Sequence, residues 1–244
     1  MAAISIHGLQ VSFGVCRAVA GLDLEIPQGS LYGLLGPNGA GKTTAISCIA
    51  GLRRADEGRI QVGDVDVGAH PERVKEEVGL VPQSIALYGE LSVLDNLRVF
   101  AGLFGLGRAR SRSRIEWALG VAQLEEKRDA RVDTLSGGMQ RRLNLVTSLL
   151  HDPPTIICDE PTTGVDPQSR NHLFETIREL HAAGRTIVYT SHYMEEVEAL
   201  CERVAIMDEG RVLREDSLEA LMGDGRNLEQ VFLDLTGRGL RDAS

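Results

Sequence analysis

The sequence predicts an α/β protein with an antiparallel N-terminal part and a separate helical lobe. Residues 4–13 and 22–26 alternate apolar and polar side chains, as half-buried antiparallel strands do. Apolar runs of strand length return further along the chain and are followed by helix-like segments. From residue 92 to residue 150 the apolar positions instead repeat with helical spacing. This last stretch therefore predicts a lobe of helices set apart from the sheet.

Length and composition indicate a globular protein. The 244 residues, 43% hydrophobic and 25% charged, are enough for one large α/β domain or for a core with a smaller lobe. No apolar run reaches the roughly 18 residues that cross a bilayer, and the N-terminus has no basic segment followed by an apolar stretch. We therefore expect a chain that neither spans a membrane nor is secreted. The net charge of -9 argues against nucleic acid as the main partner.

The cysteines give no sign of a metal or disulfide framework. Cys16, Cys48, Cys158 and Cys201 lack C-x-x-C spacing, and two of them lie in apolar runs. We interpret all four as small core residues of a protein in a reducing compartment.

An aromatic residue stands at the end of the first predicted strand. Phe13 lies among small residues, where its ring is placed either to stack on an adenine base or to serve as a core or turn aromatic. The sequence leaves both interpretations open. Residues 27–30 then predict a turn that leads into the next strand.

A glycine-rich motif predicts a phosphate-binding loop. Residues 36–44 read G-P-N-G-A-G-K-T-T and lie between an apolar run, 31–35, and a helix-like segment. The three glycines can take positive φ and carry no Cβ, so successive N–H groups can turn onto an anion at the start of the helix. Lys42 is expected to contact the β and γ phosphates, and the Thr43 hydroxyl to bind Mg²⁺. The flanking strand and helix disfavour the alternative, a chance match in a glycine-rich turn.

A hairpin, a short helix and another strand follow the motif. We expect a hairpin over residues 59–62 and 64–67, a helix over 72–77 and an apolar strand over 78–83. Gln83, at the end of this strand, is a candidate to bind Mg²⁺ or to orient a water molecule. A solvated glutamine is the alternative.

The helical lobe contains the one dense basic run of the sequence. Its helices are expected at residues 93–104, 115–124 and 138–150. The run from Arg108 to Arg114 lies between the first two, and we interpret it as a solvated linker. Contact with acidic lipid headgroups or with a partner loop is the alternative.

A second anion site is predicted at the start of the last helix of the lobe. Ser136, Gly137 and Gly138 combine a hydroxyl, bare backbone N–H groups and a helix N-terminus. An ordinary N-cap needs only the serine, and two glycines destabilise a helix start. Close approach of another group to this backbone is therefore the better explanation.

Two carboxylates follow the next apolar strand, residues 155–158. Asp159 is expected to hold the Mg²⁺ ion together with Thr43, and Glu160 is the candidate general base for an attacking water. In the loop that follows, Asp166 is expected to cap a helix starting near Gln168.

The last part of the chain predicts more strands and helices. After the strand 186–190 comes His192, at a position from which a side chain reaches a γ phosphate. The remaining elements are expected at residues 203–207 and 211–214 as strands, and from 217 and over 228–235 as helices.

Taken together, these motifs resemble those of the nucleotide-binding subunit of an ABC transporter, over nearly the whole chain. The resemblance assigns residues 36–44 to the Walker A loop, Gln83 to the Q-loop, 135–139 to the signature motif, 156–160 to Walker B, 164–166 to the D-loop and His192 to the switch histidine. Phe13 matches the adenine-stacking aromatic. Met139 replaces the usual glutamine of the signature, which follows as Gln140, and Cys158 replaces an aliphatic residue of Walker B.

The resemblance implies a P-loop NTPase fold with a RecA-like, mostly parallel sheet, an antiparallel β subdomain and an inserted helical subdomain. It implies an ATP-binding core over residues 1–84 and 152–222, a helical subdomain over 85–151 and a helical tail over 223–244. The cofactors would be ATP and Mg²⁺. Catalysis is assigned to Glu160, His192 and Gln83, and the metal to Thr43, Gln83 and Asp159. Nucleotide contacts are assigned to Phe13, Gly36, Asn38, Gly39, Ala40, Gly41, Lys42, Thr43, Thr44, Ser136, Gly137, Gly138 and Asp166.

The partners implied by the resemblance are a separate transmembrane permease subunit and a second cassette, which is either the same chain or a paralogue. This places the chain at the cytoplasmic face of the cell membrane, with residues 83–106 near the permease. The form of the signature and the C-terminal sequence 228–237 are similar to the exporter branch that moves drugs, lipids or polysaccharide-linked lipids.

Two rival functions lack their sequence signs. A soluble ATPase of the same type acting on DNA or ribosomes would need a long coiled-coil insertion or two tandem cassettes, and the sequence has neither. A P-loop GTPase would need an N-K-x-D motif that reads the base, which is also missing from the sequence.

Overall fold

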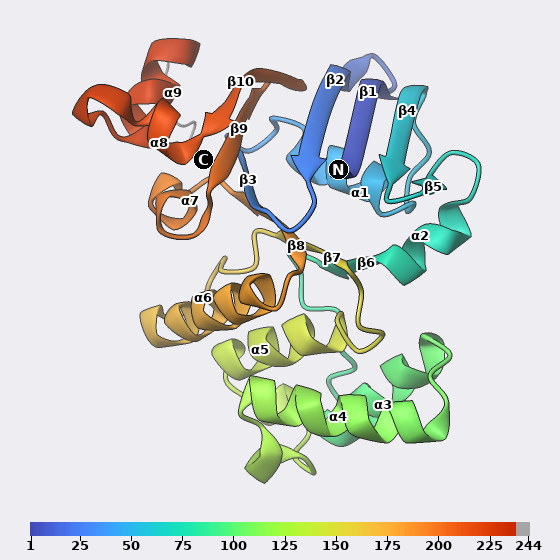
Figure 1. Ribbon diagram of the computed structural model, residues 1–244. Helices are drawn as coiled ribbons and strands as arrows, with labels where there is room; N and C mark the ends of the chain where they lie inside the picture. Colours follow the sequence, from blue (N-terminus) through green and yellow to red (C-terminus); the bar gives the residue numbers. More distant parts are fainter. Residues whose placement is uncertain (238–244) are drawn as a thin grey trace.

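The computed structural model describes residues 1–237 and contains two sheets (Figure 1). The antiparallel sheet has the order β2-β1-β4-β5. Its strands are β1 (Ala2–Phe13), β2 (Cys16–Pro27), β4 (Glu57–Val62) and β5 (Val65–Asp66). The second sheet has the order β10-β9-β3-β8-β7-β6. Its strands are β3 (Leu31–Leu35), β6 (Val78–Val81), β7 (Thr155–Asp159), β8 (Thr186–Ser191), β9 (Arg203–Asp208) and β10 (Arg211–Ser217).

The helices form two groups. The helices that accompany the sheets are α1 (Lys42–Ile49), α2 (Pro71–Glu77), α6 (Pro167–Ala182), α7 (Met194–Leu200), α8 (Leu218–Leu221) and α9 (Leu228–Thr236). The lobe contains α3 (Val93–Leu103), α4 (Arg108–Ala122) and α5 (Gly137–Thr147). Figure 1 shows this lobe at the end of the molecule opposite the antiparallel sheet. The α/β fold with an antiparallel sheet, a mostly parallel sheet and inserted helices is confirmed.

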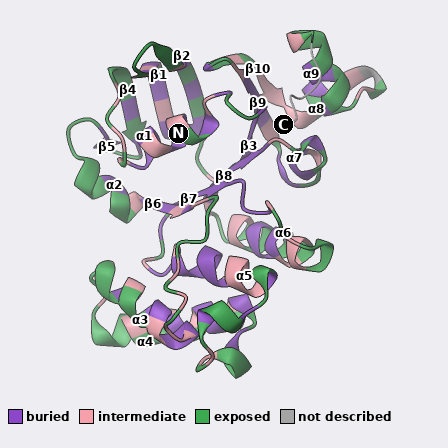
Figure 2. Cartoon of the chain, turned by 180° about the vertical axis from the view of Figure 1, so that it is seen from behind, coloured by how far each residue is buried: buried purple, intermediate pink, exposed green. Residues whose placement is uncertain are grey.

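The central parallel strands are buried on both faces, which explains their continuous apolar runs. Every residue of β3 and β7 is buried. Side chains alternate across β3: Tyr32 and Leu34 pack with β1, β2 and α1, whereas Leu31 and Leu35 pack with α6, α7 and α9. In Figure 2 the buried colour runs through these strands and along the sides of the helices that face them. The lobe has its own apolar cluster, formed by α3, α4 and α5.

The basic run is helical, so its interpretation as a linker is wrong. Helix α4 begins at Arg108, because arginine and alanine are good helix formers and the run contains no helix breaker. Arg114 lies over the Trp117 ring, 3.9 Å from its centroid. Its guanidinium donates to the carbonyls of Leu149 and Leu150 at 2.7 and 3.1 Å. This arginine therefore fixes α4 against the end of α5.

One of the expectations about the cysteines is wrong. Cys16 is exposed and is not a core residue, because it lies at the start of β2 next to the hairpin turn. Cys48, Cys158 and Cys201 are buried, as expected.

Of the tail predicted at 223–244, residues 238–244 lie outside the described residues. Within residues 1–237, none of the helices has the length and apolar character needed to cross a bilayer.

Candidate active site

The site lies where four parallel strands end. In the order β3-β8-β7-β6 these strands are parallel neighbours, so their carboxyl ends meet at one edge of the sheet. β3 leads into the glycine-rich loop, β8 into His192, β7 into Glu160 and β6 into Gln83. The topology therefore brings together four of the sequence motifs that lie up to 156 residues apart.

The glycine-rich loop has the backbone of an anion cradle. Gly41 is the N-cap of α1, with φ 99° in the left-handed region, and Gly39 has φ 85°. The first backbone bond of the helix runs from the Ala45 N–H to the Gly41 carbonyl at 2.9 Å. The N–H groups of residues 42–44 therefore precede the helical ladder and are oriented toward an anion, which the helix dipole also favours.

Gly36, unlike Gly39 and Gly41, does not have a positive φ. Its need for glycine is steric, because a Cβ there would overlap the Met207 carbonyl. The loop is also held from outside by a residue that the sequence analysis missed. Gly210, in the turn between β9 and β10, donates to the Ala40 carbonyl at 3.0 Å and accepts from the Ala20 N–H at 2.9 Å.

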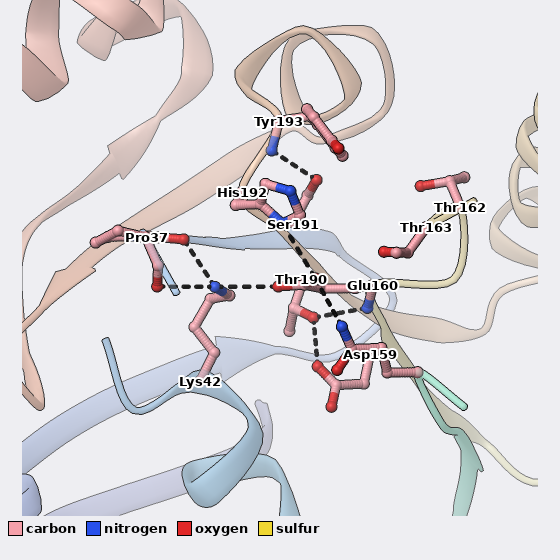
Figure 3. Close-up of polar contacts among 12 residues, drawn as sticks. Pro37, Lys42, Asp159, Glu160, Thr162, Thr163, Thr190, Ser191, His192 and Tyr193 are labelled. Carbon is pink, nitrogen blue, oxygen red and sulfur yellow. Dashed lines mark hydrogen bonds and ion pairs between the residues drawn. The ribbon is translucent and has the colours of Figure 1, made fainter. Parts of the chain in front are cut away.

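Lys42 lies inside the cradle and is buried, with 4% of its surface exposed. Its Nζ donates to the Gly36 carbonyl at 2.7 Å and to the Pro37 carbonyl at 3.2 Å, and it lies 3.3 Å from Oε1 of Glu160 (Figure 3). Burial lowers the pKa of Lys42, and the neighbouring Glu160 carboxylate opposes that shift. The three N–H donors of the ammonium group are thus matched by three acceptors.

Glu160 is the centre of the polar cluster. Besides Lys42, its carboxylate contacts the Gln83 side-chain amide at 3.2 Å and Nδ1 of His192 at 3.0 Å, both through Oε2. Its φ is 45°, a conformation that residues other than glycine adopt rarely and at a cost of about 1 kcal/mol or more. The Glu160 N–H donates to the Thr190 hydroxyl at 3.0 Å, which fixes this backbone. The side chain is thereby aimed at the cradle.

Asp159 provides a buried carboxylate beside the loop. Thr190 Oγ1 donates to its Oδ1 at 2.8 Å, and its carboxylate also bonds the Thr43 hydroxyl. Burial raises the pKa of Asp159, and these two hydrogen bonds oppose the shift. In the part of the chain that the structure describes, no cluster of three His, Cys, Asp or Glu side chains could hold a metal. One carboxylate with a hydroxyl is nevertheless the donor set that suits Mg²⁺, which prefers oxygen ligands and keeps bonds to water and phosphate.

The second predicted anion site lies on a different part of the molecule. Ser136 is the N-cap of α5 and accepts from the Met139 N–H at 3.3 Å. Ser136 and Gly137 are exposed, and a methyl group on Gly137 would meet no described atom within 4 Å. No hydrogen bond or ion pair within residues 1–237 joins residues 136–138 to the loop 36–44. The fold therefore does not bring the two anion sites of one chain together.

Gly138 has a different reason to be glycine. A Cβ there would overlap the Ser169 hydroxyl and lie 2.6 Å from the Ser169 Cβ, so this glycine lets α5 approach the start of α6. The close approach expected for this backbone thus comes, at Gly138, from the same chain. Gln140, the displaced glutamine of the signature, donates to the carbonyls of Val132 and Leu135 at 3.0 and 3.2 Å. It stabilises the loop before α5.

Two further predicted residues lie at the edges of the site. Asp166 caps α6, as expected, by accepting from the Ser169 N–H at 3.0 Å, and this bond lowers the pKa of Asp166. Phe13 is half exposed, and the guanidinium of Arg53 lies 3.8 Å from its ring centroid. One face of the ring is therefore covered, and the other remains for a base.

Arg141 of α5 is a further residue near the site that the sequence did not single out. Its guanidinium donates to the Gln83 carbonyl and, at 3.1 Å, to the Thr163 carbonyl. Arg141 thus ties the signature helix to the loops that follow β6 and β7. Its only sequence signal is its place one turn after the glycine pair, which does not identify its partners.

The cradle with its lysine, the two carboxylates at the end of β7 and the histidine after β8 define a P-loop nucleotide hydrolase. The family model described as ABC transporter matches residues 19–163, and the chain belongs to this family. It is an ATP-binding subunit with ATPase activity.

The chain is similar to several curated relatives and solved structures. The linearmycin resistance ATP-binding protein of Bacillus subtilis (strain 168) is 40% identical, covering 97% of this chain and 76% of the relative. A Nod factor export ATP-binding protein I of Ralstonia nicotianae is 43% identical, covering 85% of this chain and 65% of the relative. A solved ATP-binding subunit of an ABC transporter is 27% identical, with a TM-score of 0.86, covering 96% of this chain and 99% of that one. The curated relatives are thus longer than this chain.

Proposed function

We propose that the chain powers export of a drug or a lipid-like molecule through a separate transmembrane subunit, at the cytoplasmic face of the cell membrane. The observation that carries this proposal is the similarity over most of the chain to two proteins named for linearmycin resistance and for Nod factor export. The residues after β3, β7 and β8 provide the hydrolytic machinery that such work requires. Action on DNA or ribosomes is the alternative, which the net charge of -9 disfavours.

Each site residue has a proposed role in hydrolysis. Lys42 exchanges contacts with the Gly36 and Pro37 carbonyls for phosphate oxygens, which loosens its pairing with Glu160. Glu160 then accepts a proton from the water that attacks the γ phosphorus, and ADP leaves. His192 is held by Glu160 through Nδ1, which leaves Nε2 for the γ phosphate.

The remaining contacts concern the metal and the base. Mg²⁺, when bound by Thr43, Asp159 and the amide oxygen of Gln83, supplies positive charge to the phosphate oxygens. Phe13 stacks on adenine with the ring face that Arg53 leaves open.

The second anion site serves the nucleotide of the other cassette. Ser136 and Gly137 are exposed at a helix N-terminus and lie apart from the cradle of their own chain. We propose that they contact the ATP held by a second copy or by a paralogue, with Asp166 near the same junction. Changing the ratio of closed to open dimer from 1:99 to 99:1 needs about 5.5 kcal/mol. Two to four charge-assisted hydrogen bonds can supply this free energy.

We expect Ser136→Arg to block ATP-dependent dimerisation while each subunit still binds ATP. The larger, cationic side chain removes the N-cap hydroxyl and fills the open space over Gly137. The dimer fraction in ATP should fall at least about tenfold, measured by light scattering in a Glu160→Gln background that prevents hydrolysis. Ser113→Arg, on the exposed side of α4, is the matched control. A stable ATP-bound dimer of Ser136→Arg would contradict the shared site.

A groove between the sheet-containing core and the helical lobe is the proposed binding site of the transmembrane subunit. It has a volume of about 900 Å³ and is lined by α2 on one side and by residues of α3, α4 and the segment between them on the other. Its rim carries apolar side chains that are unusually exposed, Leu52 at 65% and Leu103 at 68%. This groove overlaps the segment 83–106 that the family resemblance assigns to the permease contact.

We expect Leu103→Glu to weaken copurification with the transmembrane subunit and to reduce transport, because it places a charge on an apolar contact. The ATPase rate of the isolated chain should stay within about twofold, since Leu103 is an exposed residue of α3 in the helical lobe. Leu213→Glu, on β10 and outside the groove, is the matched control. Unchanged assembly and transport with Leu103→Glu would refute this binding site. Recovery of ribosomes or DNA in place of a membrane protein would favour the alternative function.

A further inference from the structure

A buried glutamate behind the catalytic cluster gathers three hydroxyl groups. Glu196 lies in α7 and is 5% exposed. Its Oε2 accepts hydrogen bonds from Thr162 Oγ1, Tyr189 OH and Ser191 Oγ, each at 2.9 Å. None of the roles proposed above uses this carboxylate. Buried carboxylates are rare, and one that receives three donors is part of a built network.

The three donors come from the two segments that carry the catalytic side chains. Thr162 lies two residues after Glu160, in the loop that leads to Asp166 (Figure 3). Tyr189 and Ser191 lie in β8, and Ser191 directly precedes His192. Ser191 Oγ also accepts from the Tyr193 N–H at 2.9 Å, which fixes the backbone on the other side of His192. Glu196 therefore joins the loop after β7 to the turn after β8.

The chemistry of the network requires an acceptor. A carboxylate has only acceptor sites when ionised, and all three neighbours are hydroxyls with a proton to donate. Burial, together with the Glu196 carboxylate, raises the pKa of Tyr189, so its phenol keeps that proton. Hydrogen bonds to an ionised acceptor are about twice as strong as neutral ones. The amide oxygen of a glutamine can take the place of Oε2, but it is a neutral acceptor in place of a carboxylate. The substitution therefore weakens the three hydrogen bonds with little change in side-chain size.

We propose that Glu196 is a positioning residue that holds Glu160 and His192 in the relative position needed for hydrolysis. The 3.0 Å contact between His192 Nδ1 and Glu160 Oε2 joins the two segments. Thr190 also joins them through the Glu160 N–H, and Thr162 Oγ1 lies 3.2 Å from Tyr189 OH. Glu196 adds a link that reaches the residue directly before His192, through Thr162 and Ser191. Glu196 does not touch the nucleotide-binding loop, so it affects the hydrolytic step and not ATP binding. The inference rests on the proposed roles of Glu160 and His192.

The test compares Glu196→Gln with Glu195→Gln, its exposed neighbour on α7, in the full chain. Both changes remove one negative charge from the same helix. We expect kcat of Glu196→Gln to fall about tenfold, a loss that corresponds to about 1.4 kcal/mol, with the Kd for ATP within about twofold of the parent. Glu195→Gln should keep the parent kcat. A parent kcat in Glu196→Gln, or an equal loss in both variants, would overturn the proposal.

A second readout separates positioning from general stabilisation. In a His192→Ala background there is no imidazole to position against Glu160, so Glu196→Gln should cause little further loss of kcat. A full tenfold loss in that background would show that Glu196 does not act through this pair and would overturn the proposal.

If Glu196→Gln does not fold, Tyr189→Phe and Ser191→Ala each remove one donor and leave the carboxylate in place. Both should lower kcat several-fold with ATP affinity retained, and the parent kcat in both would be contrary to the proposal. The outcome is distinct from failure of the proposed function: if Glu160→Gln abolishes hydrolysis but Glu196→Gln does not affect it, only the role of Glu196 is refuted.

Discussion

Replacing Glu160 with glutamine is expected to lower ATP hydrolysis by about 10²-fold or more while ATP still binds. The amide keeps the size of the side chain and its neighbours Gln83 and His192, but it cannot accept the proton of the attacking water. Its loss also removes the negative charge that lies 3.3 Å from Lys42, so the lysine is free to favour phosphate. ATP should therefore be retained and should hold the closed pair of cassettes together.

The measurement is phosphate release at saturating ATP, with nucleotide binding followed separately by equilibrium titration. Glu126→Gln is the matched control, because Glu126 is exposed and lies in the helical lobe. The control should hydrolyse ATP at the parent rate. If Glu160→Gln also does so, Glu160 is not the general base and another acceptor must be sought.

Replacing Lys42 with alanine should abolish nucleotide binding or turnover, the second large effect. Lys42 is the cation inside the cradle. Without its positive charge, a bound triphosphate would be repelled by the nearby carboxylates of Asp159 and Glu160. Breaking a buried ion pair by removing one partner also destabilises the fold, typically by about 3 to 5 kcal/mol. The thermal unfolding temperature of the variant should therefore be lower than that of the parent.

Binding of a fluorescent ATP analogue, measured at a temperature where the variant is folded by circular dichroism, provides the test. Lys127→Ala, at an exposed position of the lobe, should bind like the parent. Near-normal ATP affinity in Lys42→Ala would refute the assigned role. Loss of affinity in both variants would point to a nonspecific effect of charge.

Much of the fold could be predicted because its signals are local. The alternation in β1, the buried runs of β3 and β7 and the helical period of the lobe each follow from which faces of an element are covered. The cap at Asp166 depends only on a side chain and a backbone N–H three residues later. The roles assigned to Glu160, His192 and Ser136 remain predictions that the variants above test.

Other local signals were misleading because partners elsewhere in the chain decide the outcome. The run from Arg108 has the charge of a solvated linker, but Arg114 finds the carbonyls of Leu149 and Leu150 and a tryptophan ring, which stabilise a helix. The glycine pair predicted close approach of another group to the backbone, and at Gly138 that group is Ser169 of the same chain.

Consecutive residues from Gly36 to Thr44 are enough to identify the phosphate-binding loop, and with the other motifs they indicate the class of protein. The contacts of Glu160 with Lys42, Gln83 and His192, and the link that Glu196 makes beside them, become visible only in the folded chain. The physical reason is that these contacts depend on the order of parallel strands in the sheet. That order is set by crossovers and packing between distant segments, which no short pattern of residues records.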